Sequence, residues 1–314
     1  MGMGNYSHGF RDGIMIRGAG MFDAGFGRVW YVDAKTGADG NSGKRRDRPF
    51  LTMSKALAQL DSGDTILFRG KVREQLEAPA GVFDVTIIGA ANRPRHADDH
   101  TESSGARGSS AALWTLPASA TADTPLLRVN QQGWRFHNFL MAATTSQICL
   151  DMYRNADESP ASDERDASHF DVVGMRFAGA GIHIRFNGGP NFGTIRDNVF
   201  QGATTALADT TGSGAGTNGY TRILDNYFVE NTNHVVVPLN MSLVKGNTFG
   251  KFTTTALSLL NGIGSNQVVG NFMSGDYDGG YVAATGDNWL GNIAFDVASG
   301  ETEADGATNS LPVA

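Results

Sequence analysis

The chain has little of what builds disulfide frameworks, membrane spans or nucleic-acid surfaces. Its one cysteine, Cys149, can form neither an internal disulfide nor a multi-cysteine metal site. No apolar run approaches the roughly 18 residues of a membrane-spanning helix. Basic residues are in the minority, 25 Lys and Arg against 32 Asp and Glu, for a net charge of -7. We therefore predict no nucleic-acid or membrane partner, and no metal ion or other cofactor.

Glycine, by contrast, is abundant, with 41 residues against 9 prolines. This excess indicates many tight turns rather than long helices. The first residues, MGMGNYSHGFRDG, have neither the basic start nor the apolar core of a secretory signal peptide. Synthesis in the cytoplasm is therefore expected.

A short motif recurs through the second half of the chain. GTIRDNVFQG, from Gly193, and YTRILDNYFVE, from Tyr220, both place an apolar residue three positions before Asn and Phe two positions after it. Met175 takes the Asn position in one earlier copy, and WRFHNFLM, with Asn138, is a weaker copy. Such a period of 21 to 28 residues predicts a solenoid. The Asn column consists of Asn198, Asn226, Asn247, Asn271 and Asn292.

Two solenoids fit this period, leucine-rich repeats and parallel β-helices. A leucine-rich repeat needs an apolar residue five positions before Asn, where this chain has Gly193, Thr221 and Ser242. Its leucine-rich helical half is also missing, and short β-branched segments such as GIHIRF and HVVVPL follow the motif instead. We predict an all-β fold, a right-handed, single-stranded parallel β-helix solenoid.

The Asn column has an architectural explanation in such a fold. Gly or Asp followed by Asn marks a corner, because these residues tolerate the left-handed backbone region. Coils stack roughly 4.8 Å apart, so Asn amides at matching positions can form a hydrogen-bonded ladder. The Phe after each corner is predicted to point into the core.

The predicted organisation has three parts. Residues 28–295 form the β-helix, with an amphipathic capping helix at about 49–60, where Phe50, Met53, Ala56, Leu57 and Leu60 have helical spacing. Loop insertions are expected at about 91–111 and 155–169, and residues 296–314 form a flexible acidic tail. Residues 1–27 form an arm that attaches to a partner through apolar side chains, namely Phe10, Ile14, Ile16, Phe22 and Phe26.

Five segments follow one another near the start of the predicted β-helix: VWYVD, the loop TGADGNSG, the Pro-Phe pair, the Thr-led helix and Gly-Asp-Thr-Ile. Together they resemble the N-terminal cap of the pectate-lyase-like right-handed β-helix superfamily. NYSHGFRDGIMIRG, IIGAANRPRHADDHT and QQGWRFHNFLM resemble β-helix proteins of tailed-phage virions. The second resemblance implies a virion protein, and such proteins commonly form trimers.

The superfamily includes pectin-cleaving enzymes and tailspikes that degrade polysaccharide. The best candidates for such a site are Asp197 and Asp225, in one column on neighbouring coils, with Arg222. Asp171, Arg185 and Glu230 could lie nearby. Because Gly takes the Asp position on other coils, we interpret both Asp residues as corners and predict no catalytic residue. His183, which alternates with Ile182 and Ile184, and Arg185 are predicted to point outward.

One apolar run suggests association. HVVVPLNM is apolar at consecutive positions, although one face of a β-helix strand normally meets water. We therefore predict a homo-oligomer, a trimer, with its interface at Val235, Val236, Val237 and Leu239.

The leading functional hypothesis is a non-enzymatic phage virion structural protein, made in the host cytoplasm and located in the virion. It would decorate the capsid or form a surface spike, attach to a capsid or other virion protein through the arm, and bind surface glycans. The alternative is a tailspike-like polysaccharide-degrading lyase or hydrolase, or a carbohydrate-binding domain.

Overall fold

The computed structural model describes residues 27–90, 112–154, 166–209, 218–260, 262, 264–274 and 280–295. The arm residues Phe10, Ile14, Ile16, Phe22 and Phe26 lie outside the described residues. So do the predicted insertion at 91–111, most of the one at 155–169, and the tail at 296–314.

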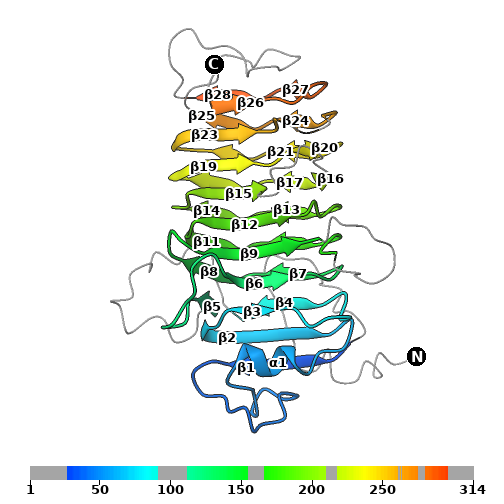
Figure 1. Cartoon of the computed structure of the whole chain (residues 1–314), viewed down its shortest axis with the longest axis vertical. Helices are drawn as coiled ribbons and strands as arrows, with labels where there is room; N and C mark the ends of the chain where they lie inside the picture. The colour runs from blue at the N-terminus through cyan, green and yellow to red at the C-terminus, as the bar shows by residue number, and fades with distance from the viewer. Residues whose placement is uncertain are drawn as a thin grey trace, which may run out of the picture.

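The described strands stack as successive turns of a solenoid, from β1 at one end to β28 at the other (Figure 1). The described strands of neighbouring turns pair in parallel, as β10 does with β13 and β12 with β15. The prediction of an all-β fold with long parallel sheets is confirmed, and the arrangement is consistent with a parallel β-helix.

Three faces run along the stack. Sheet A contains β1 (Val29–Asp33), the first part of β2 (Thr65–Arg73), β4 (Thr86–Gly89), β7 (Arg135–His137), β10 (Asp171–Val173), β13 (Thr194–Arg196), β17 (Arg222–Leu224), β21 (Leu243–Lys245), β24 (Gln267–Val269) and β27 (Asn288–Leu290). Sheet B contains the second part of β2, β5 (Ala112–Thr115), β8 (Leu140–Ala143), β11 (Arg176–Gly179), β14 (Val199–Gln201), β18 (Tyr227–Val229), β22 (Thr248–Phe249), β25 (Phe272–Ser274) and β28 (Ile293–Phe295). Sheet C contains β3 (Leu76–Glu77), β6 (Pro125–Val129), β9 (Ile148–Tyr153), β12 (Ile182–Asn187), β15 (Thr205–Asp209), β19 (Asn231–Val236), β23 (Phe252–Ser258) and β26 (Tyr281–Val282). A fourth, two-stranded sheet pairs β16 (Asn218–Gly219) with β20 (Leu239–Asn240).

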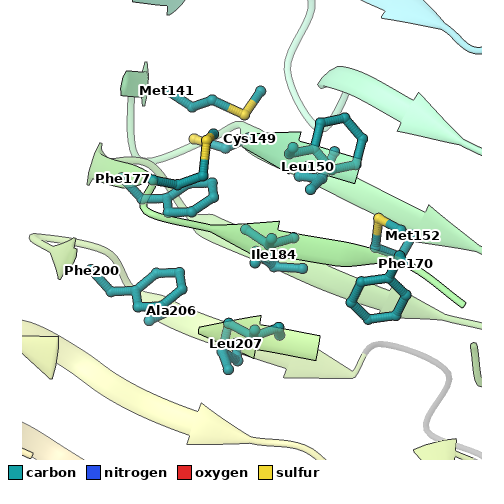
Figure 2. Close-up of a cluster of buried hydrophobic side chains, with 14 of the residues drawn as sticks. Met141, Cys149, Leu150, Met152, Phe170, Phe177, Ile184, Phe200, Ala206 and Leu207 are labelled. Atoms are coloured by element: carbon teal, nitrogen blue, oxygen red, sulfur yellow. The ribbon is translucent and has the colours of Figure 1, made fainter. Parts of the chain in front are cut away.

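The core is built from identical positions on successive turns. The phenylalanines two residues after the Asn column stack face to face inside sheet B, with ring centroids 4.9 Å apart for Phe177 and Phe200 and 4.8 Å for Phe200 and Phe228. Figure 2 shows Phe177 and Phe200 beside Cys149 and Ile184. Burial in this apolar cluster raises the pKa of the Cys149 thiol, so the cysteine is a core residue.

The corner between sheets A and B differs from the predicted one in a detail. The residue before Asn, not Asn itself, has the left-handed backbone, with φ of 59° at Asp197 and 53° at Asp225. Phe136 pairs with Val172, so Phe139 takes the Asn position, and Asn138 (φ 62°) takes the corner position before it. The sequence alignment of Asn138 with the column was therefore off by one residue, because Asn suits either position.

The Asn side chains of the column are buried and joined from turn to turn. The Asn226 Nδ2 donates to the Asn247 Oδ1 (3.0 Å) and to the Ile195 carbonyl oxygen (2.9 Å), and the Asn226 backbone nitrogen donates to the same Asn247 Oδ1 (2.9 Å). The same pattern joins Asn198 to Asn226 and Asn271 to Asn292. Each side chain thus satisfies backbone groups of the previous turn that the corner leaves outside the sheet ladders.

A second ladder lies at the corner between sheets C and A, which the sequence analysis missed. The Asn266 backbone nitrogen and Nδ2 both donate to the Asp287 Oδ1, at 3.0 and 2.8 Å, and the Ser242 nitrogen donates to the Asn266 Oδ1 at 3.0 Å. Burial raises the pKa of Asp287. The changing residue types along this ladder hide it from a repeat search.

Helix α1 (Met53–Leu57) is shorter than the predicted helix at 49–60. Phe50 pairs with β1 instead, because its nitrogen donates to the Tyr31 carbonyl oxygen (2.9 Å) and its carbonyl oxygen accepts from the Asp33 nitrogen (2.9 Å). The Thr52 Oγ1 accepts from the Lys55 nitrogen (3.1 Å) and starts the helix. Its buried side chains, among them Met53, pack into the core at the β1 end of the stack.

The apolar run after His234 is used within its own chain. Val235, Val237 and Leu239 are at most 1% exposed, whereas Val236 faces outward and is half-buried. The alternation continues from Val235 to Leu239, so Val235, Val237 and Leu239 point inward and the half-buried Val236 and Pro238 lie between them. Three of the four predicted interface residues therefore belong to the core, which corrects the reason given for a trimer. The oligomeric state itself stays a prediction.

Candidate functional site

The outer face of sheet A carries charged side chains on neighbouring turns. In each short strand the central residue points inward, as Phe136, Val172 and Ile195 do, so its neighbours face outward. The register aligns Asp171 with Arg135 on one side and Thr194 on the other. It also aligns Val173 with His137 and Arg196. We call the set Arg135, His137, Asp171, Thr194 and Arg196 the sheet A cluster.

Arg135 bridges two carboxylates at the centre of this face. Its Nε lies 3.7 Å from the Asp171 Oδ2, and its Nη2 lies 3.5 Å from the Asp84 Oδ1. The Asp171 side chain is 38% exposed, so it is accessible to a ligand. Exposed ion pairs of this kind contribute little to stability, and their arrangement is therefore of more interest for binding.

The sheet A cluster also alters proton affinities. Burial raises the pKa of Asp171, and the effect outweighs the opposing influence of Arg135, Thr194 and Arg196. Burial, together with Arg135 and Arg196, lowers the pKa of His137 to about 4, so its imidazole is neutral at neutral pH. A carboxyl group with a raised pKa beside two guanidinium groups is typical of sites that transfer protons.

The residues predicted for a catalytic site lie around the sheet A cluster rather than within it. Asp197 is a corner residue whose Oδ2 lies 3.8 Å from the Arg196 Nε, and Asp225 is an exposed corner on the next turn. Arg222 is aligned with Thr194 on the same outer face. The sequence analysis noted Asp171 but missed Arg135, His137 and Arg196. Strand register is the signal that joins them.

Arg185 and Glu230 lie elsewhere. The Arg185 Nη2 donates to the Asp151 Oδ2 and its Nε to the Asp151 Oδ1, both at 2.7 Å, on the outer face of sheet C. The Arg128 Nε adds a third contact to Asp151 at 2.8 Å. Asp151 is fully buried, and both its oxygens are occupied, which indicates a structural ion pair. Glu230 accepts a hydrogen bond from the Gln201 Nε2 (2.9 Å).

His183 points inward, contrary to the prediction. Its ring lies 5.6 Å from that of Phe177 and 5.8 Å from that of Phe200, and burial lowers its pKa to about 3. The strict alternation fails here because His183 and Ile184 are both fully buried at the start of sheet C, where the chain turns.

Two features are absent from the part of the chain that the structure describes. No three His, Cys, Asp or Glu residues come together there as a group that could hold a metal ion. No helix there has the length and apolar character of a membrane span. His96 and His100 flank Asp98 and Asp99 at a sequence spacing that could hold a metal ion, and they lie outside that part.

No family model matches the chain, and no curated protein sequence is similar to it. Solved structures do match. Pectate lyase Pel9A has a TM-score of 0.53 at 13% identity, over 91% of this chain and 81% of that one. A rhamnogalacturonan lyase has a TM-score of 0.51 at 11% identity, over 86% and 74%.

Both matches are polysaccharide lyases by name, which contradicts the leading hypothesis of a non-enzymatic phage virion protein. The resemblance to phage virion proteins rested on three short segments, one of which lies wholly and another mostly outside the described residues. At this identity the likeness is one of fold, and the fold is that of the pectate-lyase-like parallel β-helix proteins.

Proposed function

We propose that this chain binds an acidic polysaccharide across the outer face of sheet A and cleaves it there. The observation that carries the proposal is Asp171, a partly exposed carboxyl group with a raised pKa in contact with Arg135 and under the influence of Arg196. The fold shared with pectate lyase Pel9A supports the substrate class. The proposal follows from the residues of this face and not from sequence similarity.

The chemistry that suits these groups is β-elimination at a uronic acid. Arg135 and Arg196 would neutralise the sugar carboxylate, which makes the proton on the adjacent carbon more acidic. Asp171 would accept that proton, since its raised pKa makes it a stronger base than an ordinary carboxylate. The electron pair then forms a carbon–carbon double bond, the bond to the glycosidic oxygen breaks, and that oxygen takes a proton from water.

One observation favours hydrolysis as a second candidate. Asp84 and Asp171 both contact Arg135, and glycoside hydrolases use a pair of carboxyl groups on either side of the scissile bond. The products separate the two reactions. Elimination leaves an unsaturated sugar that absorbs ultraviolet light, whereas hydrolysis gives new reducing ends without that absorbance.

The test incubates the protein with polygalacturonate and with rhamnogalacturonan, and follows ultraviolet absorbance and reducing ends. We expect Asp171→Asn to lower the cleavage rate by about a hundredfold or more, the size of a typical general acid–base contribution. Asp61→Asn is the matched control, because Asp61 is also an exposed partner of an arginine, Arg28 at 3.3 Å. Wild-type protein that cleaves neither polymer, or a fully active Asp171→Asn variant, would refute the proposal.

We also propose that α1 closes the N-terminal end of the solenoid. It lies beside β1 at that end of the stack (Figure 1), and its buried side chains belong to the same core as Trp30 and Phe50. A solenoid exposes its apolar interior at its ends unless an element covers it.

A further inference from the structure

A row of bulky side chains stands on the solenoid surface beside the sheet A cluster. His169, Phe192, Tyr220 and Met241 occupy the same corner position on four successive turns, each two residues before a strand of sheet A. Phe192 is 47% exposed, Tyr220 51% and Met241 58%. We call these four residues the aromatic ridge.

The backbone at the aromatic ridge is unfavourable for such residues. All four have a left-handed conformation, with φ of 61°, 57°, 55° and 45° in chain order. In this region non-glycine residues cost about 1–2 kcal/mol, and the usual occupants are Gly, Asn, Asp and His, so Phe192, Tyr220 and Met241 are the unusual ones. The same corner on other turns has Asp84, Gly133 and Gly286, which follow that rule, and the small residue Ser265. The bulky residues in the middle therefore carry a backbone cost, which ring stacking can offset in part, and their exposure leaves them available for a surface function.

The rings of the aromatic ridge leave part of each face uncovered. His169 and Phe192 are 4.8 Å apart between centroids, Phe192 and Tyr220 are 4.9 Å apart, and both pairs are within 4° of parallel. Parallel rings in contact lie about 3.5–4.0 Å apart, so neighbouring rings are displaced sideways by about 3 Å. The displacement leaves part of each ring uncovered by its neighbour.

Charge beside the aromatic ridge selects the ligand. Arg222 follows Tyr220 by two residues and is exposed. Arg196 lies on the adjacent strand β13, where it is aligned with Leu224, two residues along the sheet from Arg222. A ligand that fits this surface has flat apolar faces in a linear repeat and negative charge at its rim. A chain of uronic acids has both features.

We propose that the aromatic ridge binds an acidic glycan chain along the solenoid axis, with sugar faces on Phe192 and Tyr220 and carboxylates toward Arg196 and Arg222. This inference rests on the proposed function, since it extends the same binding face. It assigns substrate affinity to residues that take no part in proton transfer.

The test measures binding of polygalacturonate by affinity gel electrophoresis in an Asp171→Asn background, so that the polymer is not cleaved. The double variant Phe192→Asn, Tyr220→Asn should bind about tenfold more weakly or worse, because each ring loses apolar contact with the ligand. Its melting temperature should change little, because Asn adopts the left-handed backbone more readily than Phe or Tyr, and this gain opposes the loss of ring stacking. The matched control is Phe272→Asn, Tyr227→Asn, two rings of similar exposure (47% and 45%) on sheet B.

Several outcomes would overturn the inference. One is a double variant whose affinity for polygalacturonate is unchanged, whether or not its melting temperature falls. The two rings would then contribute to stability at most, and not to binding. Another is an Asp171→Asn protein that does not bind polygalacturonate. A third is self-association that depends on Phe192 and Tyr220, which would make a second copy the occupant. If the polymer binds through the aromatic ridge but the wild-type protein does not cleave it, only the proposed catalysis is refuted. If the wild-type protein cleaves the polymer and the double variant binds and cleaves it equally well, only this inference is refuted.

Discussion

Replacing Asn247 by alanine removes a side chain that makes four hydrogen bonds at the corner between sheets A and B. Its Nδ2 donates to the Ile223 carbonyl oxygen (2.9 Å) and to the Asn271 Oδ1 (3.0 Å). Its Oδ1 accepts from the backbone nitrogen of Asn226 (2.9 Å) and from the Asn226 Nδ2 (3.0 Å). Asn247 is fully buried and Asn226 nearly so, so water cannot replace these bonds without opening the corner.

The expected loss follows from what is left unpaired. A buried donor or acceptor without a partner costs about 1–3 kcal/mol, and an ordinary hydrogen bond contributes about 1 kcal/mol. The Asn226 amide loses the acceptor that the Asn247 side chain provides, and the other bonds are lost with their partners still buried. We expect Asn247→Ala to lower the free energy of unfolding by about 3 kcal/mol.

Urea unfolding followed by far-ultraviolet circular dichroism measures this loss. The matched control is Asn288→Ala, which removes an exposed hydrogen bond from the Asn288 Nδ2 to the Gln267 Oε1 (2.9 Å) and should cost about 0.5 kcal/mol or less. If both variants unfold at the same urea concentration, the side-chain ladder does not stabilise the corner. Loss of glycan binding at unchanged stability would contradict the architectural role directly.

Two further predictions concern the interior. Burial lowers the pKa of His183 to about 3, so the stability from its neutral form is complete above the ordinary value of 6.5 and is lost as the pH falls towards 3. His183→Phe keeps a ring between Phe177 and Phe200 but removes the titrating group. The free energy of unfolding should therefore fall by about 2 kcal/mol less in this variant than in the wild-type protein between about pH 7 and about pH 5. An unchanged pH dependence would refute this. Val235→Asp should prevent folding, whereas Val236→Asp, on the half-buried outer side, should give soluble, folded protein by gel filtration and circular dichroism. Equal tolerance of the two changes would contradict the inward direction of Val235.

The sequence determined the repeat, and through it the fold class. A period of 21 to 28 residues with Asn at each corner and Phe two residues later leaves few architectures, and the parallel sheets followed from it. The inward stack of Phe177, Phe200 and Phe228 could also be predicted, because one column of a solenoid must fill its core. Strict alternation misled at corners, where two consecutive residues can turn inward, as His183 and Ile184 do.

Only the tertiary structure decided where the candidate site lies. Arg135, Asp171 and Arg196 are far apart in sequence and come together because the register of β7, β10 and β13 aligns three turns. The number of residues between these strands varies with loop length, so the sequence spacing alone does not predict the alignment. The raised pKa of Asp171 depends on its burial, which no residue pattern gives. The aromatic ridge was hidden for a related reason. His169, Phe192, Tyr220 and Met241 share no residue type, and a left-handed backbone at the same corner of each turn is what brings their side chains into one row.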